Sequence, residues 1–271
     1  MRGPPPSEGR REGLRQCDSL IAIRAPQWAM SSDWSPPEKV TLREVKINVE
    51  DIEPILRGIE SPLLKIEYPA GYVNLPTGEK MVIRRAKKEE APVVMETAKK
   101  LFDHDTDFFD LVSSRVYSEF LGWYRARMKD HVSLLGIING ELAAIGNFRL
   151  WDNDVAISLH TLTFKRRAGI GATMYAAKAE YAFDLMNMKE WWATYESYTG
   201  FRYWGIKYAQ YQKPYPQMQH ELGGSRIFFT TKEDWDRFVK PLLRDRLPIR
   251  PAPPDLLRSA EKVVPPKEVE V

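Results

Sequence analysis

The sequence predicts a fold of the α/β (α+β) class, in which one sheet and several helices form a main domain. Three observations support this prediction. Residues 132–138, 142–151 and 155–163 form three strand-like runs in succession. A turn rich in glycine then leads into an alanine-rich helical run, 172–186. Another strand-like run, 189–196, follows that helix directly.

The first two strand-like runs are separated by Asn139-Gly140, the strongest short signal for a β-hairpin. The third run, 155–163, alternates with a period of two residues. Strict alternation predicts two faces, which are Val155, Ile157 and Leu159 on one side, and Ala156, Ser158, His160 and Leu162 on the other.

The turn after residue 163 carries the main functional signal. A turn between a strand and a helix leaves backbone N–H groups without helical partners, at the positive end of the helix dipole. Gly169 and Gly171 would let this backbone approach a bulky anion, and Arg166 and Arg167 add positive charge. The alternative is a tight turn beside a solvated basic patch, because a short glycine motif alone is a weak signal.

The spacing Arg-x-x-Gly-x-Gly over residues 166–171, inside a strand–turn–helix, resembles the pyrophosphate loop of the GNAT superfamily of acyl-CoA-dependent N-acyltransferases. The run Ile83-Arg84-Arg85-Ala86, followed by acidic residues and a helical stretch from Pro92, resembles the opening of a GNAT domain. The order of elements matches over roughly residues 80–240. The resemblance implies a GNAT fold, with a mixed, mostly antiparallel central sheet flanked by helices.

The resemblance also implies a reaction. Acetyl-CoA or another acyl-CoA would be the co-substrate, and a small-molecule or protein primary amine would attack the thioester directly, with no metal. A chain with this fold that binds acyl-CoA without catalysis, as a sensor or regulatory protein, is the alternative.

Residues for binding CoA follow from the same resemblance. The pyrophosphate would be held by Arg166, Arg167, Ala168, Gly169, Ile170, Gly171 and Ala172. The backbone N–H groups of Thr161, Leu162 and Thr163 would polarise the thioester carbonyl.

The implied reaction also needs a general base for the amine and a general acid for the leaving thiolate. His160 is the first candidate for the general base and Glu196 the second, although a structural histidine and a solvated strand end are the alternatives. The tyrosine that acts as general acid in many GNAT enzymes is replaced here by Phe201. Tyr203 is therefore the first candidate for the acid and Tyr198 the second, with water as a third possibility.

Ten aromatic residues lie within residues 191–215. This cluster predicts either a pocket for a ring-bearing or apolar group, or a sheet core with a homodimer interface. Its members are Trp191, Trp192, Tyr195, Tyr198, Phe201, Tyr203, Trp204, Tyr208, Tyr211 and Tyr215.

Proline content divides the chain. Six of the twenty prolines lie in residues 1–37 and seven in residues 241–271, which predicts two poorly ordered tails. Residues 38–79, with an expected strand at 40–47 and a short helix at 50–59, form an arm expected to pack on the main domain, which comprises residues 80–240.

Composition narrows the functional classes. A net charge of +3 is too small to indicate nucleic-acid binding, and no apolar run is long enough to predict a membrane helix. The single cysteine, Cys17, allows neither an internal disulfide nor a multi-cysteine metal site. We therefore expect a cytoplasmic protein.

Overall fold

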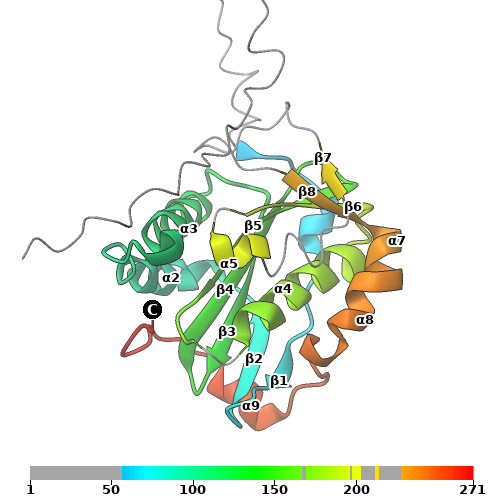
Figure 1. The fold of residues 1–271 in the computed structure, drawn as a ribbon. Coiled ribbons are helices and arrows are strands. Elements are labelled where there is room, and N and C mark those ends of the chain that lie inside the picture. The colour runs from blue at the N-terminus through cyan, green and yellow to red at the C-terminus, as the bar shows by residue number, and fades with distance from the viewer. Residues whose placement is uncertain (1–56, 167–168, 196, 203–210, 214–226, 271) are drawn as a thin grey trace, which may run out of the picture. The chain divides into compact units, whose positions relative to one another are not determined.

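The computed structural model describes residues 57–166, 169–195, 197–202, 211–213 and 227–270. Its centre is an eight-stranded sheet of order β1-β2-β3-β4-β5-β6-β8-β7 (Figure 1). The strands are β1 Gly71–Asn74, β2 Lys80–Arg85, β3 His131–Ile138, β4 Glu141–Leu150, β5 Val155–Thr163, β6 Glu190–Thr194, β7 Tyr211–Lys213 and β8 Ile227–Thr231.

Every neighbouring pair of strands is antiparallel except β5 and β6, which are parallel. A parallel pair needs a crossover connection, and the helix after the glycine turn supplies it. The predicted fold, a mixed and mostly antiparallel sheet flanked by helices, is therefore confirmed by the strand order of this chain.

Helices cover both faces of this sheet (Figure 1). The α-helices are α2 Ala91–Lys99, α3 Phe109–Tyr124, α4 Ile170–Glu180, α5 Tyr198–Gly200, α7 Lys232–Asp234, α8 Lys240–Leu242 and α9 Pro254–Ser259. The π-helical turns are Tyr181–Leu185 and Trp235–Val239, and the 3-10 turns are Pro62–Lys65, Lys88–Glu90, Thr106–Phe108 and Arg244–Arg246.

The predicted hairpin turn joins β3 to β4. Asn139 and Gly140 both have positive φ, at 51° and 82°, as a two-residue type I′ turn requires. Asparagine tolerates this region better than most residues, and glycine enters it without strain. The turn therefore sets the antiparallel register of β3 and β4.

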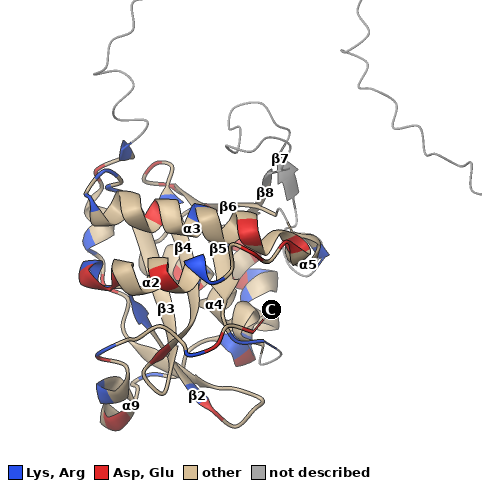
Figure 2. Ribbon diagram, turned by 90° about the vertical axis from the view of Figure 1, so that its left-hand side faces the viewer, with Lys and Arg blue, Asp and Glu red and all other residues tan. Residues whose placement is uncertain are grey.

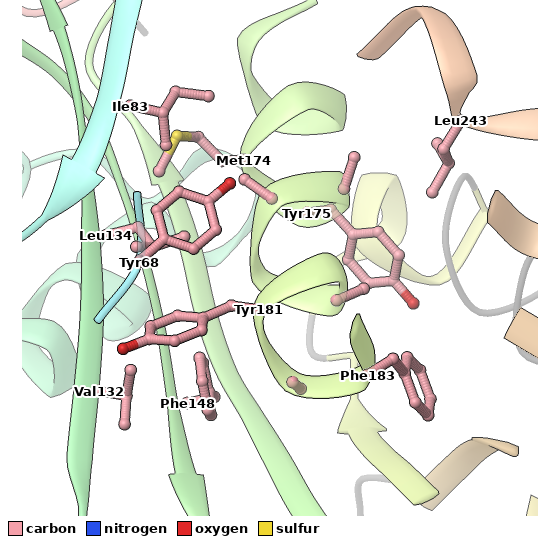
Figure 3. Close-up of a cluster of buried hydrophobic side chains, with 14 of the residues drawn as sticks. Tyr68, Ile83, Val132, Leu134, Phe148, Met174, Tyr175, Tyr181, Phe183 and Leu243 are labelled. Atoms are coloured by element: carbon pink, nitrogen blue, oxygen red, sulfur yellow. The ribbon is translucent and has the colours of Figure 1, made fainter. Parts of the chain in front are cut away.

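Two apolar clusters fill the space between sheet and helices. The cluster on the α4 face includes Phe148 and Tyr181, whose rings meet edge to face at a centroid distance of 5.7 Å (Figure 3). The cluster on the α2–α3 face includes the fully buried Phe120. The two faces of the sheet are thus both buried, and a polar side chain on either face needs a partner.

The residues before the main domain are described only in part. Residues 57–79, the described part of the predicted arm, pack on the domain, where Tyr68 is buried in the α4-face cluster. The expected tail 1–37, the strand at 40–47 and most of the helix at 50–59 lie outside the described residues.

The segment 241–270 is not the poorly ordered tail that its prolines predict. Pro254 occupies the first turn of α9, where its missing N–H costs nothing. Ala260 and Val263 are buried in the α2–α3 face cluster, and the backbone of Val264 bonds to the hairpin. The prolines here delimit short elements of a packed segment.

Burial of Val263 supports a direct test. Val263 is only 6% exposed, so Val263→Asp would bury an unpaired carboxylate and lower the free energy of unfolding by about 3 kcal/mol. Lys262→Asp, at the exposed neighbouring position, should change it by less than about 0.5 kcal/mol. Urea unfolding of both variants measures the difference; equal, small effects would mean that this segment does not pack.

Candidate functional site

The parallel strands β5 and β6 separate partway along their length. Their pairing runs from Val155 opposite Glu190 to Ser158 opposite Ala193. β5 then continues to Thr163, whereas β6 ends at Thr194. Within the described residues, the last part of β5 therefore has no strand partner on its β6 side.

Backbone N–H groups point into this opening. The N–H of Phe164 donates to the Ala143 carbonyl, so it faces β4. Successive N–H groups of a strand point to opposite edges, so those of Thr161 and Thr163 face the side that β6 has left. They form a pair of donors directed into the gap between the parallel strands.

A β-bulge lies at the point of separation. Gly146 pairs with Thr161 and Phe148 with Ser158, so Leu159 and His160 together oppose Asn147. The extra residue reverses the direction of the side chains that follow it. Bulges of this kind often lie beside active sites, where they redirect a side chain.

The bulge corrects one sequence prediction. Strict alternation places Ser158 and His160 on the same face of the sheet. In the structure the Ser158 hydroxyl contacts Lys178 of α4, whereas the His160 ring contacts Glu119 of α3. The two side chains therefore lie on opposite faces, because the bulge separates them.

A buried lysine occupies the bulge from the α4 side. The Nζ of Lys178 donates to the Ser158 hydroxyl at 2.9 Å, and to the carbonyls of His160 at 2.8 Å and Asn147 at 3.3 Å. A Cβ at Gly146 would lie 3.0 Å from the Lys178 Cγ and Cδ, so glycine makes room for this stem. Burial lowers the pKa of Lys178 to about 7, and the attraction of Glu119 opposes that shift only in part.

On the other face, His160 is held by two polar side chains. Its Nε2 lies 3.0 Å from Glu119 Oε1, and its backbone N–H donates to Asn147 Oδ1 at 2.9 Å. The Asn147 amide donates to the second Glu119 oxygen at 2.6 Å. These three residues form a closed set of hydrogen bonds, in which the His160 side chain is almost fully buried.

Burial and neighbouring polar groups shift the pKa values of Glu119 and His131 in this part of the site. Burial raises the pKa of the Glu119 carboxyl, but attraction to His160 and the hydrogen bonds outweigh burial and leave the pKa below its ordinary value. Glu119 is thus ionised at neutral pH. Burial lowers the pKa of nearby His131 to about 4, so that ring is neutral.

The glycine turn at the end of β5 begins helix α4. Gly169 is the N-cap, with a φ of 69°, and a Cβ there would lie 2.6 Å from a guanidinium nitrogen of Arg246. Gly171 differs, since among the described residues a Cβ there would meet only the Thr163 methyl, at 3.7 Å. The first turn of α4 carries no acidic side chain, so its N–H groups suit an anion.

The structure brings many of the predicted residues to this one edge. Thr161, Leu162, Thr163, Arg166, Gly169, Ile170, Gly171 and Ala172 follow one another along the end of β5 and the start of α4. The Leu162 side chain is buried in the α2–α3 face cluster. Arg167, Ala168, Glu196 and Tyr203 lie outside the described residues.

Tyr198, the second candidate acid, lies at the start of α5 and is 68% exposed. Its backbone N–H donates to Asp107, and its hydroxyl lies 3.5 Å from an Arg202 nitrogen. The backbone of Asp107, in the loop between α2 and α3, has a positive φ of 53°. Tyr198 therefore belongs to the contact between α5 and this loop.

Four residues at the site were missed by sequence reasoning. Glu119 belongs to α3, about forty residues before His160 in the sequence, and Lys178 lies in an alanine-rich run. Arg246 comes from the segment that was predicted to be a tail. Tyr195 was grouped with the aromatic cluster; burial and the neighbouring Tyr175 raise its pKa well above the ordinary value, so its hydroxyl stays protonated.

Two absences hold for the described part of the chain. No three His, Cys, Asp or Glu side chains there are arranged to hold a metal ion. None of the helices found there has the length and apolar character needed to cross a membrane.

No protein-family model matches the chain, and no curated protein matches its sequence significantly. Among solved structures, an uncharacterized protein from Bacillus halodurans has a TM-score of 0.47 at 8% identity, covering 66% of this chain and 99% of that one. RimJ of Mycobacterium smegmatis, solved with CoA-disulfide, has a TM-score of 0.45 at 14% identity, covering 62% and 90%. The GNAT domain of PAT from S. lividans has a TM-score of 0.45 at 15% identity, covering 61% and 99%. All three TM-scores are below 0.5, so the fold assignment rests on this chain's own strand order.

The buried Lys178 predicts a particular dependence of stability on pH. Its pKa is about 7 when folded and about 10.5 when unfolded, so between these values the unfolded chain binds more protons. Stability should therefore rise with pH across this window, and the Lys178 contribution should level off below about pH 7, where both states bind the proton. Relative to Lys178→Met, the parent should gain about 2 kcal/mol between pH 7 and pH 9, measured by urea unfolding. Parallel pH curves for the two proteins would contradict the assignment.

Proposed function

We propose that this protein is an acyl-CoA-dependent N-acyltransferase, most directly an N-acetyltransferase, which transfers an acyl group to a primary amine. One observation carries the proposal. The parallel strands β5 and β6 separate at the residue where a bulge redirects His160, and β5 then ends in a glycine turn that opens α4. An anion site, a pair of N–H donors and a histidine thus follow one another along a single strand.

The glycine turn would hold the CoA pyrophosphate. The open position at Gly171 lets the backbone approach a phosphate without steric conflict, and the N–H groups of α4 supply donors. Arg246, whose guanidinium lies against Gly169, adds a positive charge that can pair with a phosphate oxygen. Arg166 is a further cation at the same turn.

The thioester would lie between the separated strands. The N–H groups of Thr161 and Thr163 face this gap, and donors of this kind stabilise the oxyanion that forms when an amine attacks the carbonyl. Because they belong to a strand that is paired on its other side, they need no rearrangement in the transition state.

The amine must lose a proton before or during the attack. An alkyl amine with a pKa near 10.4 is mostly protonated at pH 7, a penalty of about 4 to 5 kcal/mol. His160 is proposed as the general base, with Glu119 stabilising the imidazolium that results. Asn147 holds both partners in register.

The leaving CoA thiolate needs a proton donor or solvent. Tyr203 remains the first candidate and Tyr198 the second. Tyr195, the residue directly after β6, is added because burial and Tyr175 raise its pKa well above the ordinary value and its hydroxyl stays protonated. A thiolate with a pKa near 8.5 leaves readily enough that water is also sufficient.

A binding protein without catalysis is the second candidate function. The observation in its favour is Phe201, which replaces the family's tyrosine and packs its ring against Phe228 instead. Release of free thiol from acetyl-CoA, measured over a panel of primary amines, separates the two. CoA binding with no thiol release above background for any amine would favour the sensor.

The loop assignment predicts the effect of Gly171→Glu. A carboxylate beside the pyrophosphate costs several kcal/mol, so affinity for CoA measured by calorimetry should fall about 100-fold or more. Gly171→Ala is the matched control, because its Cβ makes only an ordinary contact. Undiminished affinity in folded Gly171→Glu would disprove the loop assignment. Gly169 is unsuitable for this test, since its positive φ makes any substitution strained.

The base assignment predicts a pair of kinetic results. His160→Gln should lower kcat/KM by about 100- to 10,000-fold while CoA affinity is retained. Glu119→Gln removes the negative charge that would stabilise the imidazolium formed in the transition state, so the plateau of the pH–rate profile should fall. A His160→Gln enzyme with the parent rate would exclude His160 as the base.

A further inference from the structure

The last described residues of the chain lie against the glycine turn. Val264 pairs with Glu141 in parallel, and the segment then runs to Glu270. The N–H of Glu270 donates to the Phe164 carbonyl at 3.0 Å, directly beside the end of β5. The segment also contacts the end of α2, where the Lys100 ammonium donates to the Pro266 carbonyl at 2.7 Å; Figure 2 shows α2 with the acidic and basic residues of this side of the molecule.

Glu270 is bound there as an anion. Its carboxylate oxygen Oε2 accepts the backbone N–H of Arg166 at 2.7 Å, and its carbonyl accepts the Arg166 Nε–H at 3.2 Å. Arg166 is the first residue of the turn, and its guanidinium is half-buried over the Phe109 ring, 3.9 Å from the centroid. A carboxylate from the chain itself therefore occupies one N–H group of the turn.

We propose that the C-terminal segment 264–270 is an intramolecular competitor of CoA, in which the Glu270 carboxylate takes the place of a phosphate oxygen at Arg166. The inference rests on the proposed function only in naming CoA as the displacing anion. For CoA to engage Arg166, Glu270 must leave and its contacts must break.

The contacts that hold the two ends of this segment differ in kind. Near its start, Val263 is buried, and Val264 bonds to the backbone of Leu142 and Gly140. Near its end, Val269 is partly buried against the α2–α3 face cluster, whereas Glu270 itself is exposed and is held by the hydrogen bonds to Phe164 and Arg166. Glu270 can thus detach while the buried part of the segment stays anchored, and the CoA pyrophosphate, which carries two negative charges, outcompetes one carboxylate.

The expected size of the effect follows from population arithmetic. If the competent, detached state is only a fraction of the free protein, the apparent Kd rises in inverse proportion to that fraction. A segment that is docked most of the time would weaken CoA binding about three- to tenfold.

Calorimetric titration of the full chain with CoA tests the proposal. Glu270→Gln and Glu270→Ala should tighten CoA binding about three- to tenfold. Glu268→Gln removes the same charge from an exposed side chain two residues away and should leave the affinity within about twofold of the parent. Circular dichroism confirms that all four proteins share one fold. In hydrogen exchange, saturating CoA should expose the Glu270 amide, whose bond to Phe164 would be broken.

The outcomes separate this inference from the proposed function. CoA affinity that is unchanged or weaker in both Glu270 variants, with the parent still binding CoA, overturns the competitor and leaves the proposed function intact. Equal tightening in Glu268→Gln also overturns it, because a general charge effect would then explain the gain. Absence of CoA binding in every variant overturns both.

Discussion

The arrangement of the site depends on one buried interaction, the contact of the Lys178 ammonium with the β-bulge in β5. A bulge leaves ladder carbonyls unpaired inside the protein, and each unpaired buried group costs about 1 to 3 kcal/mol. Lys178 donates to the carbonyls of Asn147 and His160 together, and Gly146 leaves room for its stem. The lysine therefore stabilises a bulge that the strand alone would not favour.

That bulge links the two faces of the sheet. Before it, Ser158 faces α4; after it, His160 faces α3 and meets Glu119. The bulge lies where β6 stops pairing with β5, so His160 and the N–H groups of Thr161 and Thr163 come directly after the point of separation. The proposed acyl transfer would need both features, since a donor pair without a base leaves the amine protonated.

Much of the fold was predictable from local chemistry. Asn139-Gly140 identified the hairpin because few residues accept two successive positive φ angles, and the run 155–163 matches β5 residue for residue. The faces of β5 were mispredicted beyond Ser158, because alternation assumes an uninterrupted ladder and the lysine that supports the bulge is twenty residues away. Glu119 was missed for a similar reason: only the packing of α3 on the sheet brings it to His160. The packed C-terminal segment was misjudged because prolines at element boundaries have the same composition as a tail.

A structure of the chain with CoA bound would test the central claim most directly. The account predicts the pyrophosphate against the N–H groups that begin α4, and the sulfur between β5 and β6, on the side that the Thr161 and Thr163 N–H groups face. It also predicts an open path from the sulfur to the His160 ring. CoA bound elsewhere, or a sulfur on the β4 side of β5, would contradict the account.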